Sequence, residues 1–325
     1  MNSQRERLGS PNRKSGKTPI VVLTGPTAIG KTQLALEASK HISLEVISAD
    51  SRQIYRGMDI GTGKPTKEQQ RSAPHHLIDV MDPGEVFSAA DFASEALRII
   101  EEVRRRGVVP LIVGGTFLYL KALLQGFFDA PGRSEPVRAR LLEMAERSGG
   151  ESLHRRLLEL DPEAASTIHP NDHVRLVRAL EVIETTGKTV SELKLQQARL
   201  DEPPVEAALL ALSADRQTIN KAIDERVERM FANGFVEEVM GLLEAGYSPS
   251  LNSFSSLGYR QVADYISGSS SLDDAKEATK VQTRRFAKKQ LLWMAQDWGF
   301  EFLRADETKP NLSRVIELCR WAAIG

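Results

Sequence analysis

The 325-residue sequence contains one cysteine, Cys319, and no apolar run near the roughly 18 residues that cross a bilayer. The single thiol excludes an internal disulfide framework and a four-cysteine zinc site, and it favours a reducing, cytoplasmic compartment. Basic residues are not in excess either: 43 Lys and Arg stand against 44 Asp and Glu, a formal net charge of -1. The chain as a whole therefore does not attract nucleic acid, which leaves only local basic patches for that purpose.

The amino-terminal residues are basic and carry no apolar segment, with five Lys or Arg side chains against the single acid Glu6. A secretory signal needs an apolar core after its basic start, so we interpret residues 1–17 as a disordered basic leader. Over the whole chain 41% of residues are hydrophobic and 27% are charged. This composition is enough to form one large or two modest globular domains.

Apolar runs alternate with helical periodicity in the first 130 residues. Buried strands are predicted at Ile20–Leu23, Leu44–Asp50, residues 108–115 (VVPLIVGG) and, later, Val205–Asp215. Helices are predicted at Lys31–Lys40 and Phe92–Arg105. This alternation indicates an α/β fold in which helices cover both faces of a parallel sheet.

The stretch from about Val137 to Gln197 shows only helical periodicity and is rich in Arg, Glu and Leu. Because one more strand is predicted after it, we interpret it as an all-helical insertion into the α/β domain. The predicted organisation is a core of residues 18–130 and 204–325 with an inserted helical domain of residues 131–203.

The segment GPTAIGKT, residues 25–32, lies between the first predicted strand and the first predicted helix. It fits the phosphate-loop pattern G-x-x-x-x-G-K-[ST] at every fixed position. Its glycines let backbone N–H groups converge on phosphate oxygens, Lys31 can bridge two phosphates, and Thr32 can ligate Mg²⁺. The predicted diphosphate-binding residues are Gly25, Pro26, Thr27, Ala28, Ile29, Gly30, Lys31 and Thr32.

The strand at residues 108–115 lacks the acidic metal ligand that ATP-using proteins of this architecture normally carry there. It runs into LIVGGT, with Gly114, Gly115 and Thr116 at the position of the acid. The strand before it does end in an acid, Asp50, which would face the ligand crevice at the carboxyl edge of a parallel sheet. Three roles stay open for Asp50: metal ligand, general base or helix N-cap.

Two nearby features allow a structural or a functional interpretation. Lys64 and the backbone around Thr62, in YRGMDIGTGKP, could close over a bound anion or form a plain loop. The adjacent His75 and His76 lack cysteine neighbours and regular ligand spacing, which disfavours a zinc site.

Arginines occur on two predicted helices. Arg226 follows the last predicted strand, and its local sequence alone predicts a surface arginine paired with Asp224 or Glu228. Arg175 and Arg178, in HPNDHVRLVRALEV, are three residues apart and so share a helix face. That pair could contact a polyanion.

The segment KVQTRRFAKKQLLWMAQDW, residues 280–298, is the most basic part of the chain outside the leader. It carries Lys280, Arg284, Arg285, Lys288 and Lys289 with no acid among them and with Phe286 and Trp293 interleaved. A charge run on a helix is usually a solvated face. The absence of compensating Glu leaves binding to nucleic acid equally open.

Taken together, these segments resemble the tRNA dimethylallyltransferases, also called tRNA isopentenyltransferases. The resemblance runs from about Thr18 to about Trp298 and rests on an ordered series of motifs: GPTAIGKT, DSRQIY, YRGMDIGTGKP, PHHLID, VGGTFLYLKALL, HPNDHVRLVRALEV, LGYRQ and KKQLLW. The sequence departs from the family pattern at Ser256 and Leu257, where a cysteine and a β-branched residue are common, and at Lys289 and Leu292, where Arg and Thr are frequent.

The resemblance implies a P-loop NTPase-like core with an inserted helical tRNA-binding domain. It implies transfer of the dimethylallyl group from dimethylallyl diphosphate to the N6 amine of the adenosine 3′-adjacent to the anticodon, with Mg²⁺ as cofactor. The implied partner is the tRNA anticodon stem-loop, with no membrane and no obligate protein partner.

The resemblance also implies roles for individual residues. Asp50 would be the general base, with Thr116 and Arg226 completing the catalytic set, Arg226 gripping the leaving group and Thr32 binding the metal. The implied tRNA-binding residues are Asp50, Ser51, Arg52, Gln53, Thr116, Arg138, Arg175, Arg178, Gly258, Tyr259, Arg260, Lys288, Lys289 and Gln290.

Two other functions stay open on the residues alone. One is a small-molecule kinase that binds ATP in the same loop and uses Asp50 as base toward a hydroxyl; the other is a non-enzymatic, nucleotide-gated RNA-binding protein. The missing acid at LIVGGT argues against ATP use. The basic helix would have no role in a small-molecule kinase.

Overall fold

The computed structural model describes residues 17–126, 134–200, 204–296 and 298–324. The chain divides into two compact units, one formed by the residues up to Leu124 and from Pro204 onward, the other by residues 125–203. The predicted basic leader, apart from Lys17, lies outside the described residues. No helix within the described ranges is long and apolar enough to cross a membrane.

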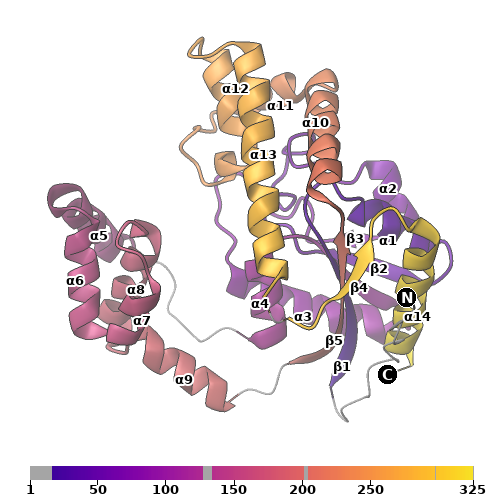
Figure 1. Cartoon of the computed structure of the whole chain (residues 1–325), viewed down its shortest axis with the longest axis horizontal. Helices are drawn as coiled ribbons and strands as arrows, with labels where there is room; N and C mark the ends of the chain where they lie inside the picture. The colour runs from indigo at the N-terminus through magenta and orange to yellow at the C-terminus, as the bar shows by residue number, and fades with distance from the viewer. Residues whose placement is uncertain (1–16, 127–133, 201–203, 297, 325) are drawn as a thin grey trace, which may run out of the picture. The chain divides into compact units, whose positions relative to one another are not determined.

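The first unit is built on a parallel sheet (Figure 1). Its strands are β1 (Thr18–Thr24), β2 (Leu44–Ser48), β3 (His75–His76), β4 (Val109–Val113), β5 (Val205–Ser213) and β6 (Glu301–Arg304). They are arranged in the order β3-β2-β4-β1-β5-β6, and Val21 of β1 pairs with Leu111 on one side and Ala208 on the other. The predicted α/β fold with a parallel sheet is confirmed.

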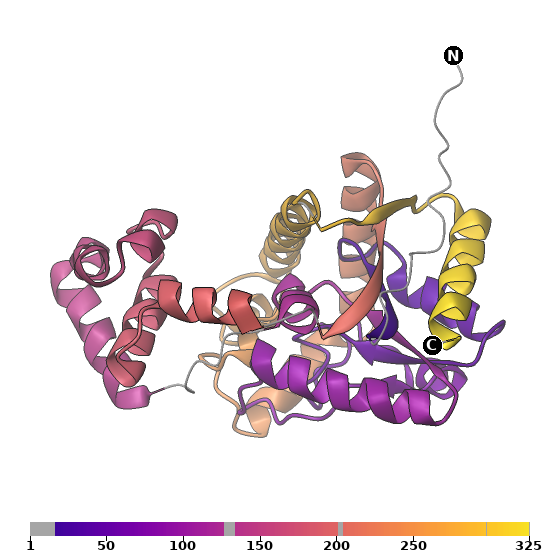
Figure 2. The same ribbon diagram turned by 90° about the horizontal axis from the view of Figure 1, so that it is seen from below.

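Alternate residues of β1 pack against opposite layers of helices. Ile20 and Val22 share a core with α3 (Ala89–Arg105) and α4 (Phe117–Gln125). Val21 and Leu23 share the opposite core with α1 (Lys31–Ser39) and α14 (Thr308–Ala323). The yellow helix α14 lies beside the sheet in both views (Figures 1 and 2), and it packs on α1 and β1. Because both faces are covered, the central residues of β1, Ile20 to Leu23, are all apolar.

Two strands of the sheet were not predicted, β3 and β6. They are the two edge strands, with two and four residues, and the structure gives them partial exposure. A short edge strand produces neither a continuous apolar run nor a sustained alternation, so its sequence carries little strand signal.

Further helices surround the carboxyl edge of the sheet. They are α2 (Lys67–Ser72), α10 (Arg216–Ala232), α11 (Phe235–Glu244), the 3₁₀ turn η1 (Ser253–Ser255), α12 (Tyr259–Ile266) and α13 (Leu272–Met294). Helices α10 and α13 pack side by side (Figure 1). A third core joins Phe235 and Tyr259 of this layer to Ile54, Tyr55 and Met58, from the loop after β2.

The second unit is all-helical within its described residues. It contains α5 (Glu135–Ser148), α6 (Gly150–Leu160), α7 (Pro162–Thr167), α8 (His173–Thr186) and α9 (Val190–Leu200). Leu141, Leu153, Leu157, Leu176 and Leu180 are fully buried in its core. The unit therefore has its own apolar centre, as expected of a domain.

Candidate active site

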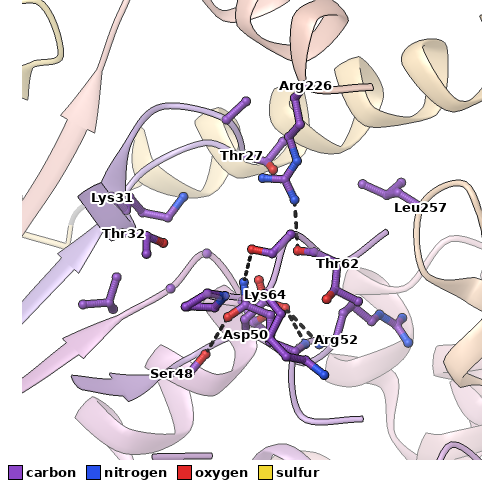
Figure 3. Close-up of a pocket in the computed structure, with 18 of the residues that line it drawn as sticks. Thr27, Lys31, Thr32, Ser48, Asp50, Arg52, Thr62, Lys64, Arg226 and Leu257 are labelled. Atoms are coloured by element: carbon purple, nitrogen blue, oxygen red, sulfur yellow. Dashed lines mark hydrogen bonds between the residues drawn. The ribbon is translucent and has the colours of Figure 1, made fainter. Parts of the chain in front are cut away.

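The carboxyl ends of β1, β2 and β4 face a cavity of about 940 Å³. All of the residues that line it belong to the first unit. They include the phosphate loop after β1, Asp50 after β2 and Gly114 to Thr116 after β4. The loop around Thr62 and Arg226 of α10 complete the lining (Figure 3). Ligands of open parallel sheets bind at this edge because the loops after neighbouring strands converge there.

The phosphate loop turns sharply between β1 and α1. Gly25 has a φ of +148°, and a Cβ at this position would lie 2.8 Å from the carbonyl oxygen of Leu212, so glycine is required. Gly30 has a φ of +97° at the start of α1, and Ala28 takes a φ of +67°, which is rare for a residue with a side chain. The loop backbone is thus held open toward the cavity, with the amino end of α1 beneath it.

Lys31 has no carboxylate partner among the described residues. Its ammonium donates to the backbone carbonyl oxygens of Gly25 and Pro26, at 2.9 and 2.8 Å. Burial lowers the pKa of Lys31 to about 8, although the negative charge of Asp50 partly opposes this. A phosphate group at the loop would supply the missing negative charge.

Asp50 is not a helix N-cap, which was one of the three roles left open by the sequence; the roles of metal ligand and general base stay predictions. Its Oδ1 accepts hydrogen bonds from the backbone N–H groups of Arg52 (2.9 Å) and Gln53 (3.4 Å). The segment it caps is a turn and not a helix. No described residue donates to Oδ2, and Asp50 lines the cavity (Figure 3). One carboxylate oxygen therefore holds the turn while the other is free to accept a proton or a metal.

The other residues of DSRQ are fixed by hydrogen bonds from their surroundings. Thr116 Oγ1 accepts from the backbone N–H of Ser51 at 3.0 Å, which ties the loop after β4 to the loop after β2. The Arg52 guanidinium donates to the Asn252 carbonyl and to Ser255 Oγ, both at 2.9 Å. Gln53 Nε2 donates to the Gly63 carbonyl at 3.3 Å. The four residues thus connect three separate segments around the cavity.

Arg226 is not a surface arginine with an acidic partner, as its local sequence indicated. Asp224 and Glu228 pair instead with Arg284 and Lys280 of α13. The Arg226 guanidinium is partly buried and donates to the Thr62 carbonyl at 2.9 Å (Figure 3), and among the described residues it has no carboxylate partner. Burial lowers its pKa, and Asp50 opposes this. Its positive charge faces the cavity uncompensated.

Lys64 has a structural role, which settles the choice that the sequence left open. Its side chain is 2% exposed and its ammonium binds Asp59 (2.6 Å), Asp79 (2.5 Å) and the Tyr55 carbonyl (2.7 Å). Three acceptors saturate the three donors of an ammonium group. Lys64 therefore holds its own loop together and has no donor left for an anion.

Gln290 is buried at the wall of the cavity, and its contact with tRNA stays a prediction. Its Oε1 accepts from the Thr27 backbone N–H at 2.8 Å, and its Nε2 donates to the Gly115 carbonyl at 2.9 Å. A Cβ on Gly115 would lie 2.2 Å from that amide nitrogen. Gln290 is thus a bridge from α13 to the loops after β1 and β4, which a motif of consecutive residues does not reveal.

The side chain of Tyr259 is 0% exposed, and its contact with tRNA likewise stays a prediction. Its hydroxyl donates to Glu238, and Gly258 is buried against Phe235. Arg260 is exposed. Of the three residues of LGYRQ with predicted tRNA contacts, Arg260 is the one whose side chain is exposed.

The basic face of α13 is smaller than the sequence indicated. Lys280 binds Glu228 of α10 at 2.6 Å, and Arg284 binds Asp224, so acids distant in sequence compensate both charges. In the described part of the chain, no acid pairs with the exposed side chains of Arg285, Lys288 and Lys289. The uncompensated cations are therefore confined to the carboxyl-terminal half of the helix.

Three arginines with predicted tRNA contacts lie in the second unit and make ion pairs there. Arg138 and Arg178 both approach the fully buried carboxylate of Glu181, at 3.6 and 3.0 Å. Arg175 pairs with Asp172, the N-cap of α8, at 3.4 Å. Their contacts with RNA stay a prediction.

A metal at this cavity would depend on the ligand for most of its coordination. In the described ranges, no cluster of three His, Cys, Asp or Glu side chains is arranged to hold a metal ion. His75 and His76 bind the Ala73 carbonyl and Glu45. The Thr32 hydroxyl lines the cavity and has no hydrogen-bond partner among the described residues. This donor set fits Mg²⁺, which keeps waters and is held largely by phosphate oxygens.

The sequence matches the family described as IPP transferase over residues 53–297. The tRNA dimethylallyltransferase of Geobacter sulfurreducens is 48% identical over 94% of this chain and 97% of its own. That of Thermomicrobium roseum is 46% identical over 91% of this chain and 88% of its own.

Solved structures give the same result. The tRNA delta(2)-isopentenylpyrophosphate transferase of Staphylococcus epidermidis superposes with a TM-score of 0.68 at 34% identity, covering 94% of this chain and 99% of that chain. A eukaryotic dimethylallyltransferase acting on tRNA gives 0.77 at 26% identity, covering 92% of this chain and 77% of that chain. The predicted resemblance is confirmed, and the chain belongs to the IPP transferase family.

Proposed function

We propose that this protein transfers the dimethylallyl group of dimethylallyl diphosphate to the N6 amine of the adenosine 3′-adjacent to the anticodon of tRNA, releasing diphosphate. The names of its relatives support tRNA as acceptor and dimethylallyl as the group transferred. Because tRNA is the acceptor, we assign the activity to the cytoplasm.

The observation that carries the proposal is the distribution of charge in the cavity. Lys31 and Arg226 are both desolvated, and neither has a carboxylate partner among the described residues. Asp50 supplies a carboxylate, while the position after β4 is occupied by glycines and Thr116. Such a cavity suits a substrate whose diphosphate is the leaving group, in a reaction that transfers no phosphoryl group.

Departure of the diphosphate is the step these cations would assist. The allylic C–O bond breaks, the bonding electrons leave with the diphosphate, and positive charge develops on the allylic carbon. The phosphate-loop N–H groups, Lys31 and Arg226 would stabilise the departing anion. Mg²⁺, held by the Thr32 hydroxyl and the diphosphate oxygens, would neutralise further negative charge when bound.

Asp50 would act on the acceptor. An exocyclic adenine amine is a weak nucleophile because its lone pair is delocalised into the ring. As the N–C bond forms, one amine proton must leave, and the free Oδ2 of Asp50 would receive it. Oδ1 stays engaged with the turn at Arg52, which would keep the carboxylate oriented during the transfer.

The acceptor base must leave its stack to reach a cavity of this depth, at a cost of a few kcal/mol. Contacts with the phosphate backbone would offset that cost. Candidates are the uncompensated Arg285, Lys288 and Lys289 of α13, and the arginines of the second unit.

A direct assay tests the function. The protein is incubated with unmodified tRNA, labelled dimethylallyl diphosphate and Mg²⁺, and label is expected in the tRNA with release of diphosphate. Replacement of the target adenosine by guanosine puts a carbonyl oxygen in place of the N6 amine and should abolish incorporation. No transfer, together with phosphorylation of a small substrate from ATP, would support a kinase instead.

The variant Asp50→Asn separates the two roles of Asp50. The amide oxygen can still accept from the Arg52 N–H, so thermal stability and diphosphate binding should be retained. Transfer should fall by about 10²- to 10⁴-fold because the general base is lost. An Asp50→Asn protein with nearly normal turnover would remove the base from the mechanism.

A further inference from the structure

The loop of residues 59–63 forms one wall of the cavity and is held from behind by a single side chain. Glu238, in the first turn of α11, accepts three backbone N–H groups: those of Asp59 (2.8 Å), Ile60 (2.6 Å) and Gly61 (3.1 Å). A carboxylate that accepts several backbone donors fixes the path of that backbone strongly. Glu238 itself does not line the cavity.

Tyr259 completes this support. Its hydroxyl donates to Glu238 Oε1 at 2.6 Å, and its ring packs edge-on against Phe235. A Cβ on Gly61 would lie 2.2 Å from the Phe235 ring and 2.5 Å from the Tyr259 ring, so the loop rests directly on both. Burial and the adjacent charge of Glu238 raise the pKa of Tyr259 well above its usual value, which keeps the hydroxyl protonated as a donor.

The opposite side of the same loop meets Arg226. The Thr62 carbonyl accepts from the guanidinium at 2.9 Å (Figure 3), and a Cβ on Gly63 would lie 2.3 Å from the same group. The guanidinium therefore lies close against the loop backbone. Any shift of residues 59–63 would move the Thr62 carbonyl and so change the orientation of the Arg226 guanidinium in the cavity.

We propose that Glu238, supported by Tyr259, is a positioning residue that sets the alignment of Arg226 toward the diphosphate through the backbone of residues 59–63. The proposal rests on the proposed function, because it takes a diphosphate as the anion that Arg226 meets. Glu238 touches neither substrate; its effect passes through three N–H donors and one carbonyl.

Binding of inorganic diphosphate, measured by calorimetry on the full chain, tests the proposal in a double-mutant cycle. Arg226→Ala should weaken binding about tenfold or more, since a charge-assisted contact is lost. Glu238→Gln places an amide N–H₂ against backbone donors, so it should displace the loop and weaken binding about three- to tenfold. In the Arg226→Ala background, Glu238→Gln should have no further effect.

The matched control is Glu237→Gln, which removes the same charge from the same turn of α11 at an exposed position. Its diphosphate affinity should equal that of the unaltered protein. If circular dichroism shows that Glu238→Gln does not fold, Tyr259→Phe replaces it, since this change removes only the hydrogen bond to Glu238. Tyr259→Phe should weaken diphosphate binding less than Glu238→Gln, and it should have no effect in the Arg226→Ala background.

Two outcomes overturn the positioning role. One is an unchanged affinity in folded Glu238→Gln; the other is an equal loss with and without Arg226, as a general loosening of the core would give. The proposed function fails separately, by absence of transfer to tRNA from dimethylallyl diphosphate in the unaltered protein. That result can occur whether or not the cycle supports a link between Glu238 and Arg226.

Discussion

Two glycine-rich loops line the same cavity, and each contains one lysine, but the surroundings of the two lysines are opposite in character. In residues 25–32, Lys31 donates only to backbone carbonyls and its pKa is lowered to about 8. In residues 57–64, Lys64 is enclosed by Asp59, Asp79 and the Tyr55 carbonyl. A partly buried cation without a carboxylate partner is available for an incoming anion, whereas a cation saturated by acceptors stabilises the fold.

Lys31→Ala should produce the largest effect and should act on function. We expect kcat/KM for dimethylallyl transfer to fall about 10²- to 10³-fold, because a cation at the departing diphosphate is lost. The free energy of unfolding should fall by less than about 1 kcal/mol, since the ammonium has no ionic partner to leave behind. Initial rates and urea denaturation measure the two quantities. A large loss of stability in Lys31→Ala would show that Lys31, like Lys64, mainly stabilises the fold.

Lys64→Met should show the reverse pattern. The change keeps the aliphatic stem but leaves Asp59 without its cation and Asp79 with Lys67 alone, so the free energy of unfolding should fall by about 2 kcal/mol; both acids are partly exposed, which limits the loss. Diphosphate affinity of the folded protein should change less than about threefold. Lost affinity at unchanged stability would mean that Lys64 binds the anion after all.

The pH dependence of diphosphate binding sharpens the contrast. The pKa of Lys31 is about 8 in the free protein, so its proton is lost as pH rises through 8, while a bound diphosphate favours the charged form. Affinity should therefore fall about tenfold per pH unit above 8. Calorimetry from pH 7 to 9.5 measures the slope, and subtracting the slope of Lys31→Ala removes the titration of diphosphate itself.

The contrast between paired and unpaired cations also applies to α13, where we expect the smallest effect of the four predictions. Lys288→Ala with Lys289→Ala should weaken tRNA binding several-fold and reduce the salt dependence of log K by about 1 to 2, because two uncompensated cations are removed. The control Lys280→Ala removes a lysine that is paired with Glu228 and should change neither quantity. Equal effects of the two variants would show that pairing does not decide RNA contact.

The central strands and the phosphate loop were predictable because their signals are local. β1, β2, β4 and β5 are mostly apolar, and residues 25–32 contain two glycines and a lysine at the fixed positions of the phosphate-loop pattern. The short edge strands β3 and β6 leave no such pattern. The candidate residues around the cavity were found by resemblance and strand position together, since a parallel sheet brings its carboxyl ends to one edge.

Ion pairing was not predictable, because the partners are distant in sequence. Local spacing assigned Asp224 and Glu228 to Arg226, whereas the structure gives them to α13. The burial of Tyr259 and Gln290 depends on tertiary packing in the same way. Glu238 had no signal at all: on a helix it resembles any solvated acid, and only the three N–H groups converging on it reveal its role.

The bond from the Thr27 N–H to Gln290 joins residues 263 positions apart. The phosphate loop leaves the ribosome early in translation. The Gln290 side chain that binds its Thr27 N–H becomes available only after α13 has been synthesised and has packed. A growing chain therefore carries its phosphate loop for most of translation in an unfinished form. Unfinished chains would sequester little prenyl donor, and a premature stop before α13 would yield a protein without a formed donor site.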